Sequence, residues 1–307
     1  MIEHLNNYPQ KFNILITSKC NLRCKHCYLN PKQTEMSIET FSDIVVFLDK
    51  INVKEVCIEG GEPLCHQKFD LICHSLSTLL CTKKIVTNAT LLTDDSINLI
   101  DKTFDVVQVS IDGGTKAEYE NIRGLNSFSN LIKGVELLSN IKNKVQINFV
   151  LTSLNYLNID KLFSFAFSYG LYRFRFVLVV DFSRKIIPSE DIISCFILKV
   201  IELKKQYRNA EISFVFPEQS ILPYTDLLLL NGISNYIGIC YAATVYTVID
   251  SDKTVYPCNF LTRKKPLFSF CCETFFHNWK MDDFLNNVRK NLQTNECIGC
   301  PANYDCL

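Results

Sequence analysis

The sequence lacks a surplus of either charge, a long hydrophobic run and any low-complexity or repeated tract. Lysine plus arginine equal aspartate plus glutamate at 32 each, so no basic excess favours binding to a nucleic-acid backbone. No apolar stretch approaches the roughly 20 residues that cross a bilayer, and polar residues follow the first methionine closely. We therefore expect a soluble, cytoplasmic protein with neither nucleic acid nor membrane as a partner.

Cysteine, in contrast, is abundant, with 15 residues in a chain of 307. Without a secretion signal, metal ligation explains these thiols better than disulfides do. Eight of them fall in two regions: Cys20, Cys24 and Cys27 near the start, and Cys240, Cys258, Cys297, Cys300 and Cys306 near the end. Isolated cysteines elsewhere are expected to act as small hydrophobic residues: Cys57, Cys65, Cys73, Cys81 and Cys195.

Apolar periodicity predicts six strands that alternate with helices. The predicted strands are residues 12–17, 55–59, 84–88, 106–111, 145–151 and 173–179. The predicted helices are residues 37–48, 68–80, 93–102, 127–140, 158–169 and 189–207. Such alternation implies a parallel α/β sheet with helices outside, either doubly wound or curled into a partial barrel.

The alternation is predicted to stop after about Glu211, where a smaller unit begins. Residues 246–250 and 255–257 read as two strands of a hairpin around Ser251, Asp252 and Lys253. Because a single core stops growing at roughly 250 to 300 residues, two units are expected. We place them at residues 1–208 and 209–307.

The first cysteine cluster reads CxxxCxxC and directly follows the first predicted strand. Its three thiolates would lie at the carboxyl edge of the sheet, where α/β folds keep their sites. Three ligands suit an iron–sulfur cubane with one iron left free of protein, whereas a zinc site would need a fourth ligand, which His26 could supply. The segment Gly60-Gly61-Glu62-Pro63 ends the second predicted strand.

This loop and the GGEP segment together resemble the radical S-adenosylmethionine superfamily, whose loop reads CxxxCx(aromatic)C with His26 here in the aromatic position. The resemblance implies a partial (β/α)6 TIM-like barrel and a 4Fe-4S cluster held by Cys20, Cys24 and Cys27. It also implies S-adenosylmethionine on the open iron and an external electron donor such as flavodoxin or ferredoxin. The implied cofactor contacts are His26, Gly60, Gly61, Glu62, Pro63, Asn88, Ser110, Asp112, Arg123 and Asn148.

Two positions bear on the resemblance in different ways: one has two alternative roles, and the other departs from the residue that is usual in the family. Arg123 lies in a segment similar to the family's IRG motif, where the arginine either reaches the methionine carboxylate or stabilises the fold. Ala89 stands where relatives often have glycine, so the backbone there is expected to be less free.

The second cysteine cluster has a CxxC pair at Cys297 and Cys300 and more distant thiols. From the residues alone, four thiolates fit either structural zinc or a fully ligated 4Fe-4S cluster. The region resembles the Twitch or truncated SPASM extension, a small domain of β-hairpin plus helix, although Lys253 replaces a usual glycine. That implies a second, auxiliary 4Fe-4S cluster on Cys240, Cys258, Cys297 and Cys300, with Cys306 as the substitute ligand. A second auxiliary cluster is not favoured, although Cys271 and Cys272 keep it as an alternative.

The resemblance implies an enzyme that abstracts hydrogen from a substrate carbon, most in keeping with a ribosomally synthesised peptide. The expected outcome is epimerisation, a cross-link or a thioether, with Cys271, Cys272 and Cys306 as candidate hydrogen donors. Because 19 residues precede Cys20, leader recognition is assigned to a separate protein. The alternatives are a radical dehydrogenase of a small alcohol or aminoglycoside precursor, and a non-catalytic iron–sulfur redox sensor.

Overall fold

The computed structural model describes residues 8–29, 33–180, 185–216, 218–235, 243–262 and 265–293. Within these ranges the strands form an 11-stranded sheet in the order β11-β10-β9-β1-β2-β3-β4-β5-β6-β7-β8. The strands are β1 (Lys11–Thr17), β2 (Glu55–Gly60), β3 (Thr82–Thr87), β4 (Val106–Ser110), β5 (Val145–Leu151), β6 (Arg173–Leu178), β7 (Glu211–Val215), β8 (Ser234–Asn235), β9 (Tyr246–Ile249), β10 (Thr254–Tyr256) and β11 (Phe268–Ser269).

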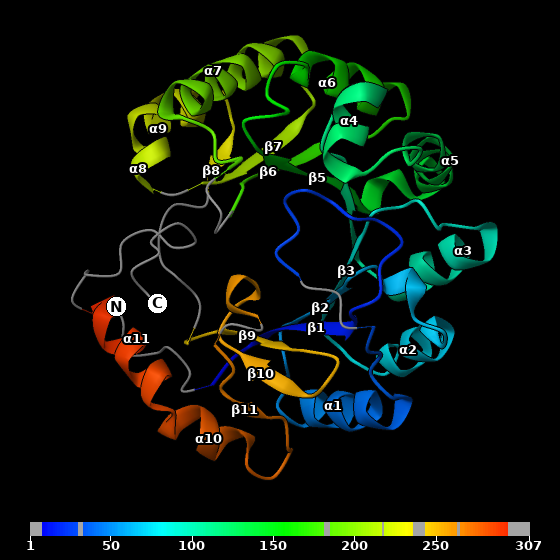
Figure 1. Cartoon of the computed structure of the whole chain (residues 1–307), viewed down its shortest axis with the longest axis vertical. Coiled ribbons are helices and arrows are strands. Elements are labelled where there is room, and N and C mark those ends of the chain that lie inside the picture. Colours follow the sequence, from blue (N-terminus) through cyan, green and yellow to red (C-terminus); the bar gives the residue numbers. More distant parts are fainter. Residues whose placement is uncertain are drawn as a thin grey trace.

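Strands β1 to β8 run parallel, and the sheet they form curves with helices on its outside (Figure 1). The helices are α1 (Ile38–Lys50), α2 (Phe69–Leu76), α3 (Asp94–Thr103), α4 (Lys116–Arg123), α5 (Phe128–Leu138), α6 (Ile159–Ser168), α7 (Glu190–Gln206), α8 (Glu218–Ile221), α9 (Thr225–Leu230), α10 (Phe275–Met281) and α11 (Asp283–Gln293). Short 3-10 turns lie at Pro63–Cys65, Ser139–Lys144, Leu222–Tyr224 and Asn259–Leu261. The partial TIM-like barrel expected from the sequence is confirmed.

Local sequence accounts for these elements. In α1 the side chain of Ser37 accepts a hydrogen bond from the backbone N–H of Thr40, and Phe41, Ile44 and Leu48 are buried at helical spacing. In β5 burial alternates residue by residue. The result is one apolar layer between sheet and helices, filled largely by aliphatic and phenylalanine side chains.

The opposite face of the sheet is polar. Along each strand, the residues of this face alternate with the residues of the core. They include Asn13 on β1, Glu59 on β2, Asn148 on β5 and Arg175 on β6. Arg175 donates a 2.8 Å hydrogen bond to Oδ1 of Asn148 across neighbouring strands. A polar inner face suits the binding of a polar ligand, whereas a packed barrel interior would carry branched aliphatic side chains there.

One sequence expectation is corrected by the sheet. The alternation does not end after Glu211, because β7 begins at that residue and pairs in parallel with β6, and β8 pairs in parallel with β7. The predicted hairpin is confirmed by the pairing of Val255 with Ile249. However, β9 also pairs in parallel with β1, so the hairpin extends the barrel sheet itself. The domain boundary at residue 208 stays a prediction.

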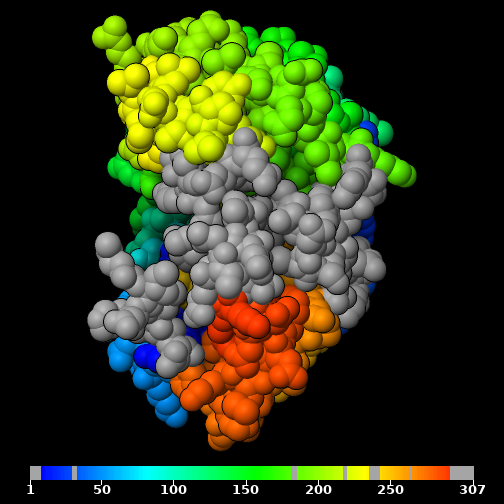
Figure 2. All heavy atoms as spheres, turned by 90° about the vertical axis from the view of Figure 1, so that its left-hand side faces the viewer, coloured from blue at the N-terminus to red at the C-terminus, as the bar shows by residue number. Residues whose placement is uncertain are grey.

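Helices α10 and α11 cover the start of the barrel. The Phe275 ring lies 5.0 Å from that of Phe47 on α1 and 5.8 Å from that of Phe12 on β1, measured between centroids. Seen from the side, this helix pair and the segment from α8 to β8 lie at opposite ends of one face (Figure 2). None of the helices in the described ranges combines the length and apolar character that crossing a membrane requires.

Candidate functional site

The cysteine loop leaves the carboxyl end of β1 and is tied to two other parts of that sheet edge. The backbone N–H of Lys25 donates to the carbonyl of Ile122 at the end of α4, at 2.9 Å. The Asn21 side chain donates to Oγ1 of Thr90, beyond β3, at 2.8 Å. The loop is therefore fixed on the edge where the sequence analysis expects the site.

The three loop thiols have separate local partners. Sγ of Cys20 accepts from the N–H of Leu22 at 3.4 Å, Cys24 donates to the carbonyl of Arg123 at 3.9 Å, and Cys27 donates to its own loop. Among the described residues no three histidine, cysteine or acidic side chains converge in ligating geometry. Burial raises the pKa of Cys20 to about 11, so this thiol would have to give up its proton in order to bind iron as a thiolate.

Glu62 of the GGEP segment is almost fully buried and joins β2 to β3. Its carboxylate accepts 2.7 Å hydrogen bonds from Oγ1 of Thr87 and from the N–H of Asn88. Burial raises the pKa of Glu62 to about 6, although these hydrogen bonds oppose the shift. In the structure this residue, predicted to contact the cofactor, holds the end of β3 in place, and the buried Pro63 starts a 3-10 turn beside it.

The two glycines are required by close backbone packing. A Cβ on Gly60 would lie 2.3 Å from the carbonyl oxygen of Thr17, and one on Gly61 would lie 2.2 Å from that of Lys19. Gly60 also has a φ of 151°, which side chains rarely tolerate. Ala89 has a φ of 60°, a left-handed conformation that favours glycine and explains why the departure at this position matters.

Asp112 and Arg123 form a buried ion pair directly below the loop. Nε and one terminal nitrogen of Arg123 each lie 2.5 Å from Oδ2 of Asp112, and Oδ1 accepts from the N–H of Val150 at 2.7 Å. The other terminal nitrogen lies 3.7 Å from Sγ of Cys24. Burial alone would lower the pKa of Arg123, but Asp112 outweighs it and holds that pKa above its ordinary value. Arg123 therefore connects the end of α4 to the end of β4 and to the cysteine loop, and its contact with the methionine carboxylate stays a prediction.

His26 lies beside the same carboxylate, with Nε2 at 3.5 Å from Oδ2 of Asp112. Burial lowers the pKa of His26 to about 4 despite the attraction of Asp112, so the ring is neutral near pH 7. Its Nδ1 atom is buried and has no hydrogen-bond partner among the described residues. A buried nitrogen in this state is available to a polar group of a bound ligand.

The remaining predicted contacts lie along the same edge. Asn88 donates to Oδ1 of Asn21 at 3.0 Å, so it positions the cysteine loop. Ser110 ends β4 and is paired in register with Asn148 on β5. The structure thus brings together all the cofactor contacts expected from the resemblance, together with the three loop cysteines, at one end of the barrel.

A second polar cluster, not anticipated from the sequence, lies around Glu59. Its carboxylate accepts from the side chains of Asn13 at 2.5 Å and Asn259 at 2.8 Å. Tyr246 donates to Asn259 at 2.8 Å, and the ring of Tyr28 meets that of Phe260 edge-on. Burial raises the pKa of Glu59 to about 7. No sequence signal marks this cluster, because its members are separated by up to 246 residues.

Of the C-terminal cysteines, Cys258 is half-buried after β10, and Cys271 and Cys272 lie between β11 and α10. Sγ of Cys271 donates to Glu273, and that of Cys272 donates to the carbonyl of Asp43. Cys240, Cys297, Cys300 and Cys306 lie outside the described residues.

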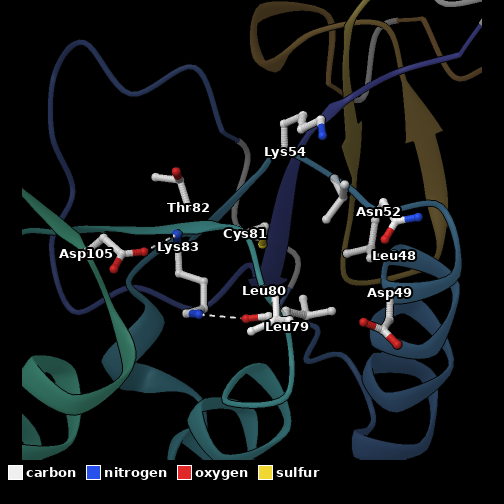
Figure 3. A pocket seen from close by; sticks show the side chains of 11 residues that line it. Leu48, Asp49, Asn52, Lys54, Leu79, Leu80, Cys81, Thr82, Lys83 and Asp105 are labelled. Atoms are coloured by element: carbon white, nitrogen blue, oxygen red, sulfur yellow. Dashed lines mark hydrogen bonds between the residues drawn. The ribbon is translucent and has the colours of Figure 1, made fainter.

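A surface hollow exists at the opposite end of the barrel (Figure 3). It is lined by Lys54 and Thr82, where β2 and β3 begin, and by Leu79 in the segment between α2 and β3. Lys83 closes its wall, donating from its backbone N–H to Asp105 and from Nζ to the carbonyl of Leu79, each at 2.8 Å. This amino edge of the strands serves stability in barrel folds, so the hollow is not the candidate site.

A curved parallel sheet with this cysteine loop and GGEP segment defines a radical S-adenosylmethionine domain. Residues 14–166 match the model of the Radical SAM superfamily, and the chain belongs to that superfamily, whose enzymes use S-adenosylmethionine and a 4Fe-4S cluster. Over 93% of its length it is 24% identical to mycofactocin maturase MftC from Mycolicibacterium smegmatis, of which it covers 74%. Other curated relatives are matched over about half of their own length.

Solved structures show the same fold. Streptococcus suis SuiB, bound to the precursor peptide SuiA, superposes with a TM-score of 0.78 at 19% identity, over 93% of this chain and 67% of that one. The enzyme anSMEcpe, with bound AdoMet and the Kp18Cys peptide, superposes with a TM-score of 0.73 at 22% identity, over 93% and 84% of the two chains.

Proposed function

We propose that this radical SAM enzyme modifies a peptide by abstracting hydrogen from one of its carbon atoms. The observation that carries the proposal is the convergence of the cysteine loop, the GGEP segment and the Asp112–Arg123 pair on one edge of a barrel with a polar inner face. When bound, the cluster and S-adenosylmethionine supply the reductive cleavage that generates a 5′-deoxyadenosyl radical.

The chain's own residues bind and orient these groups. Cys20, Cys24 and Cys27 would hold the cluster, and the Arg123 guanidinium 3.7 Å from Sγ of Cys24 offsets the thiolate charge. Glu62 and Asn88 fix the ends of β2 and β3 against the loop. The neutral His26 ring shields the buried ion pair from water.

A peptide is favoured over a small alcohol by two of the similarities. MftC is named a maturase, and both superposed structures were solved with a peptide. On this chain, the half-buried Asn148–Arg175 pair offers donors to a peptide carbonyl or carboxylate on the inner face. Epimerisation, a cross-link and a thioether are the candidate outcomes.

The proposal extends to the C-terminal region. Cys258, Cys240, Cys297 and Cys300 would hold an auxiliary 4Fe-4S cluster. Cys258 follows β10 and so stands at the end of the hairpin that extends the barrel sheet. A separate leader-recognition protein, a flavodoxin or ferredoxin donor and a cytoplasmic location complete the proposal, since reduced thiols and an oxygen-sensitive cluster suit a reducing compartment.

The first experiment measures iron and sulfide in anaerobically reconstituted protein. The triple variant C20A/C24A/C27A is compared with wild type and with C195A, which removes an exposed thiol on α7. Two cubane clusters give about eight irons that fall to about four in the triple variant, and C195A keeps all of them. About four irons in wild type that fall to none in the triple variant would contradict the proposed auxiliary cluster. With dithionite, only wild type and C195A should produce 5′-deoxyadenosine.

The second experiment separates peptide from small molecule. The loaded enzyme is incubated with any short peptide that is found encoded beside its gene, and separately with small secondary alcohols, and the products are analysed by mass spectrometry. A loss of two hydrogens from the peptide indicates a cross-link or thioether, and a gain of one deuterium in heavy water indicates epimerisation. Oxidation of an alcohol with the peptide unchanged would overturn the peptide assignment.

A further inference from the structure

The Tyr119 hydroxyl is a buried donor without a partner. The side chain is fully buried on α4, its ring packs against Phe128 at 5.7 Å between centroids, and its hydroxyl makes no hydrogen bond to any described residue. A buried hydroxyl without a partner is destabilising, because it has given up its hydrogen bonds to water. A phenylalanine would fill the same space without this cost, so the hydroxyl calls for an explanation.

The surroundings of Tyr119 are those of the cysteine loop. Arg123 lies one turn later on the same face of α4 and reaches both Asp112 and Sγ of Cys24. The loop is bonded to this helix end by the Lys25 N–H to Ile122 carbonyl bond. Burial raises the pKa of the Tyr119 hydroxyl, and the nearby charges that also act on this pKa are those of Arg123, Asp112, Cys24 and Glu62.

We propose that Tyr119 and Arg123 form a two-donor site for the sulfur atoms of the loop cluster and set its reduction potential. This inference rests on the proposed cluster at Cys20, Cys24 and Cys27. Hydrogen bonds to cluster sulfur stabilise the more negative, reduced state and so raise the potential. Arg123 is held by Asp112 and is already directed at Cys24, whereas the Tyr119 hydroxyl gains its partner when the cluster is present.

The test compares Y119F with Y207F. The Tyr207 hydroxyl lies at the end of α7 and shares a 3.1 Å hydrogen bond with Ser164, so its removal is the matched control. In cluster-free protein, Y119F should unfold at the same or a slightly higher temperature than wild type, because it loses no hydrogen bond. Iron content per chain is measured first, because a wild-type protein without a cluster would contradict the proposed function and is thereby distinguished from failure of this inference.

The loaded proteins are then titrated with dithionite and followed by electron paramagnetic resonance. The loop cluster's signal is identified by its change on adding S-adenosylmethionine. We expect the ratio of reduced to oxidised cluster at a fixed potential to fall about three- to tenfold in Y119F, where tenfold corresponds to about 59 mV for one electron. An exchangeable proton coupling to the cluster should disappear in Y119F and persist in Y207F.

An unchanged potential in Y119F, equal to that of Y207F, would overturn the inference. So would a Y119F protein that binds less iron than wild type, because the hydroxyl would then serve cluster retention and not potential.

Discussion

Asn259 and Glu59 lie 200 residues apart in the sequence and are joined by a 2.8 Å hydrogen bond from Nδ2 to Oε2. The bond connects the turn that follows Cys258 to the end of β2, immediately before the GGEP segment. The C-terminal hairpin region and the cysteine loop region are therefore linked by side chains as well as by the sheet.

Replacing Asn259 with alanine should weaken this link. Glu59 would keep the Asn13 amide and the Cys57 thiol as hydrogen-bond donors, and Tyr246 would lose its acceptor. We expect the free energy of unfolding to fall by about 1.5 to 3 kcal/mol, the range for hydrogen bonds to charged groups. Urea denaturation of cluster-free protein measures it, with N278A on the exposed face of α10 as control. A loss equal to that of N278A would show that the link adds no stability.

Glu59 should also contribute to pH dependence. Its folded pKa, raised to about 7 by burial, exceeds the unfolded value, so its protonation favours the folded state. That stability is present below the unfolded pKa and is lost as the pH rises through about 7. E59Q should therefore show a flatter fall in unfolding free energy between about pH 4.5 and 7 than wild type. E136Q, altered on the exposed surface of α5, should keep the wild-type slope.

The close packing of Gly134 against Ala89 predicts the opposite of what helix propensity alone would predict for an alanine at position 134. Glycine to alanine inside a helix ordinarily stabilises by about 1 kcal/mol, but a Cβ on Gly134 would lie 2.0 Å from the carbonyl oxygen of Ala89. G134A should therefore destabilise, by roughly 1 to 3 kcal/mol as in other overpacked sites. A89G should stay within about 1 kcal/mol of wild type, because relief of its left-handed strain offsets added unfolded-chain entropy. A higher melting temperature for G134A would contradict this packing.

The Asp112–Arg123 pair should show strong energetic coupling. R123M leaves the Asp112 carboxylate buried without its cation, which costs about 3 to 5 kcal/mol. The double variant D112N/R123M should lose clearly less than the sum of the two single variants. The exposed Lys199–Glu202 pair on α7 is the control, where K199M should cost less than about 1 kcal/mol. Additive losses in the double variant would refute the coupling.

The cysteine loop, the GGEP segment and the strand-end residues could be predicted because short motifs and alternating periodicity are both local in sequence. Helix α4 was missed because its apolar residues are few, and with it Tyr119 went unnoticed. β7 was missed because five residues carry little periodic signal. The Glu59 cluster could not be predicted, since it depends on which strands become neighbours. The roles of Glu62 and Arg123 required the hydrogen bonds that only the fold defines.

The parallel pairing of β1 with β9 has a consequence for synthesis. Lys11 pairs with Glu55 on one side, but its partner on the other side is Tyr246, so that edge of β1 stays unpaired until residue 246 has been made. Pairings so distant in sequence are slow to form, and an unpaired strand edge invites association with other chains meanwhile. Nascent chains stalled before residue 246 should therefore depend on chaperones, whereas chains released beyond it can cover that edge themselves.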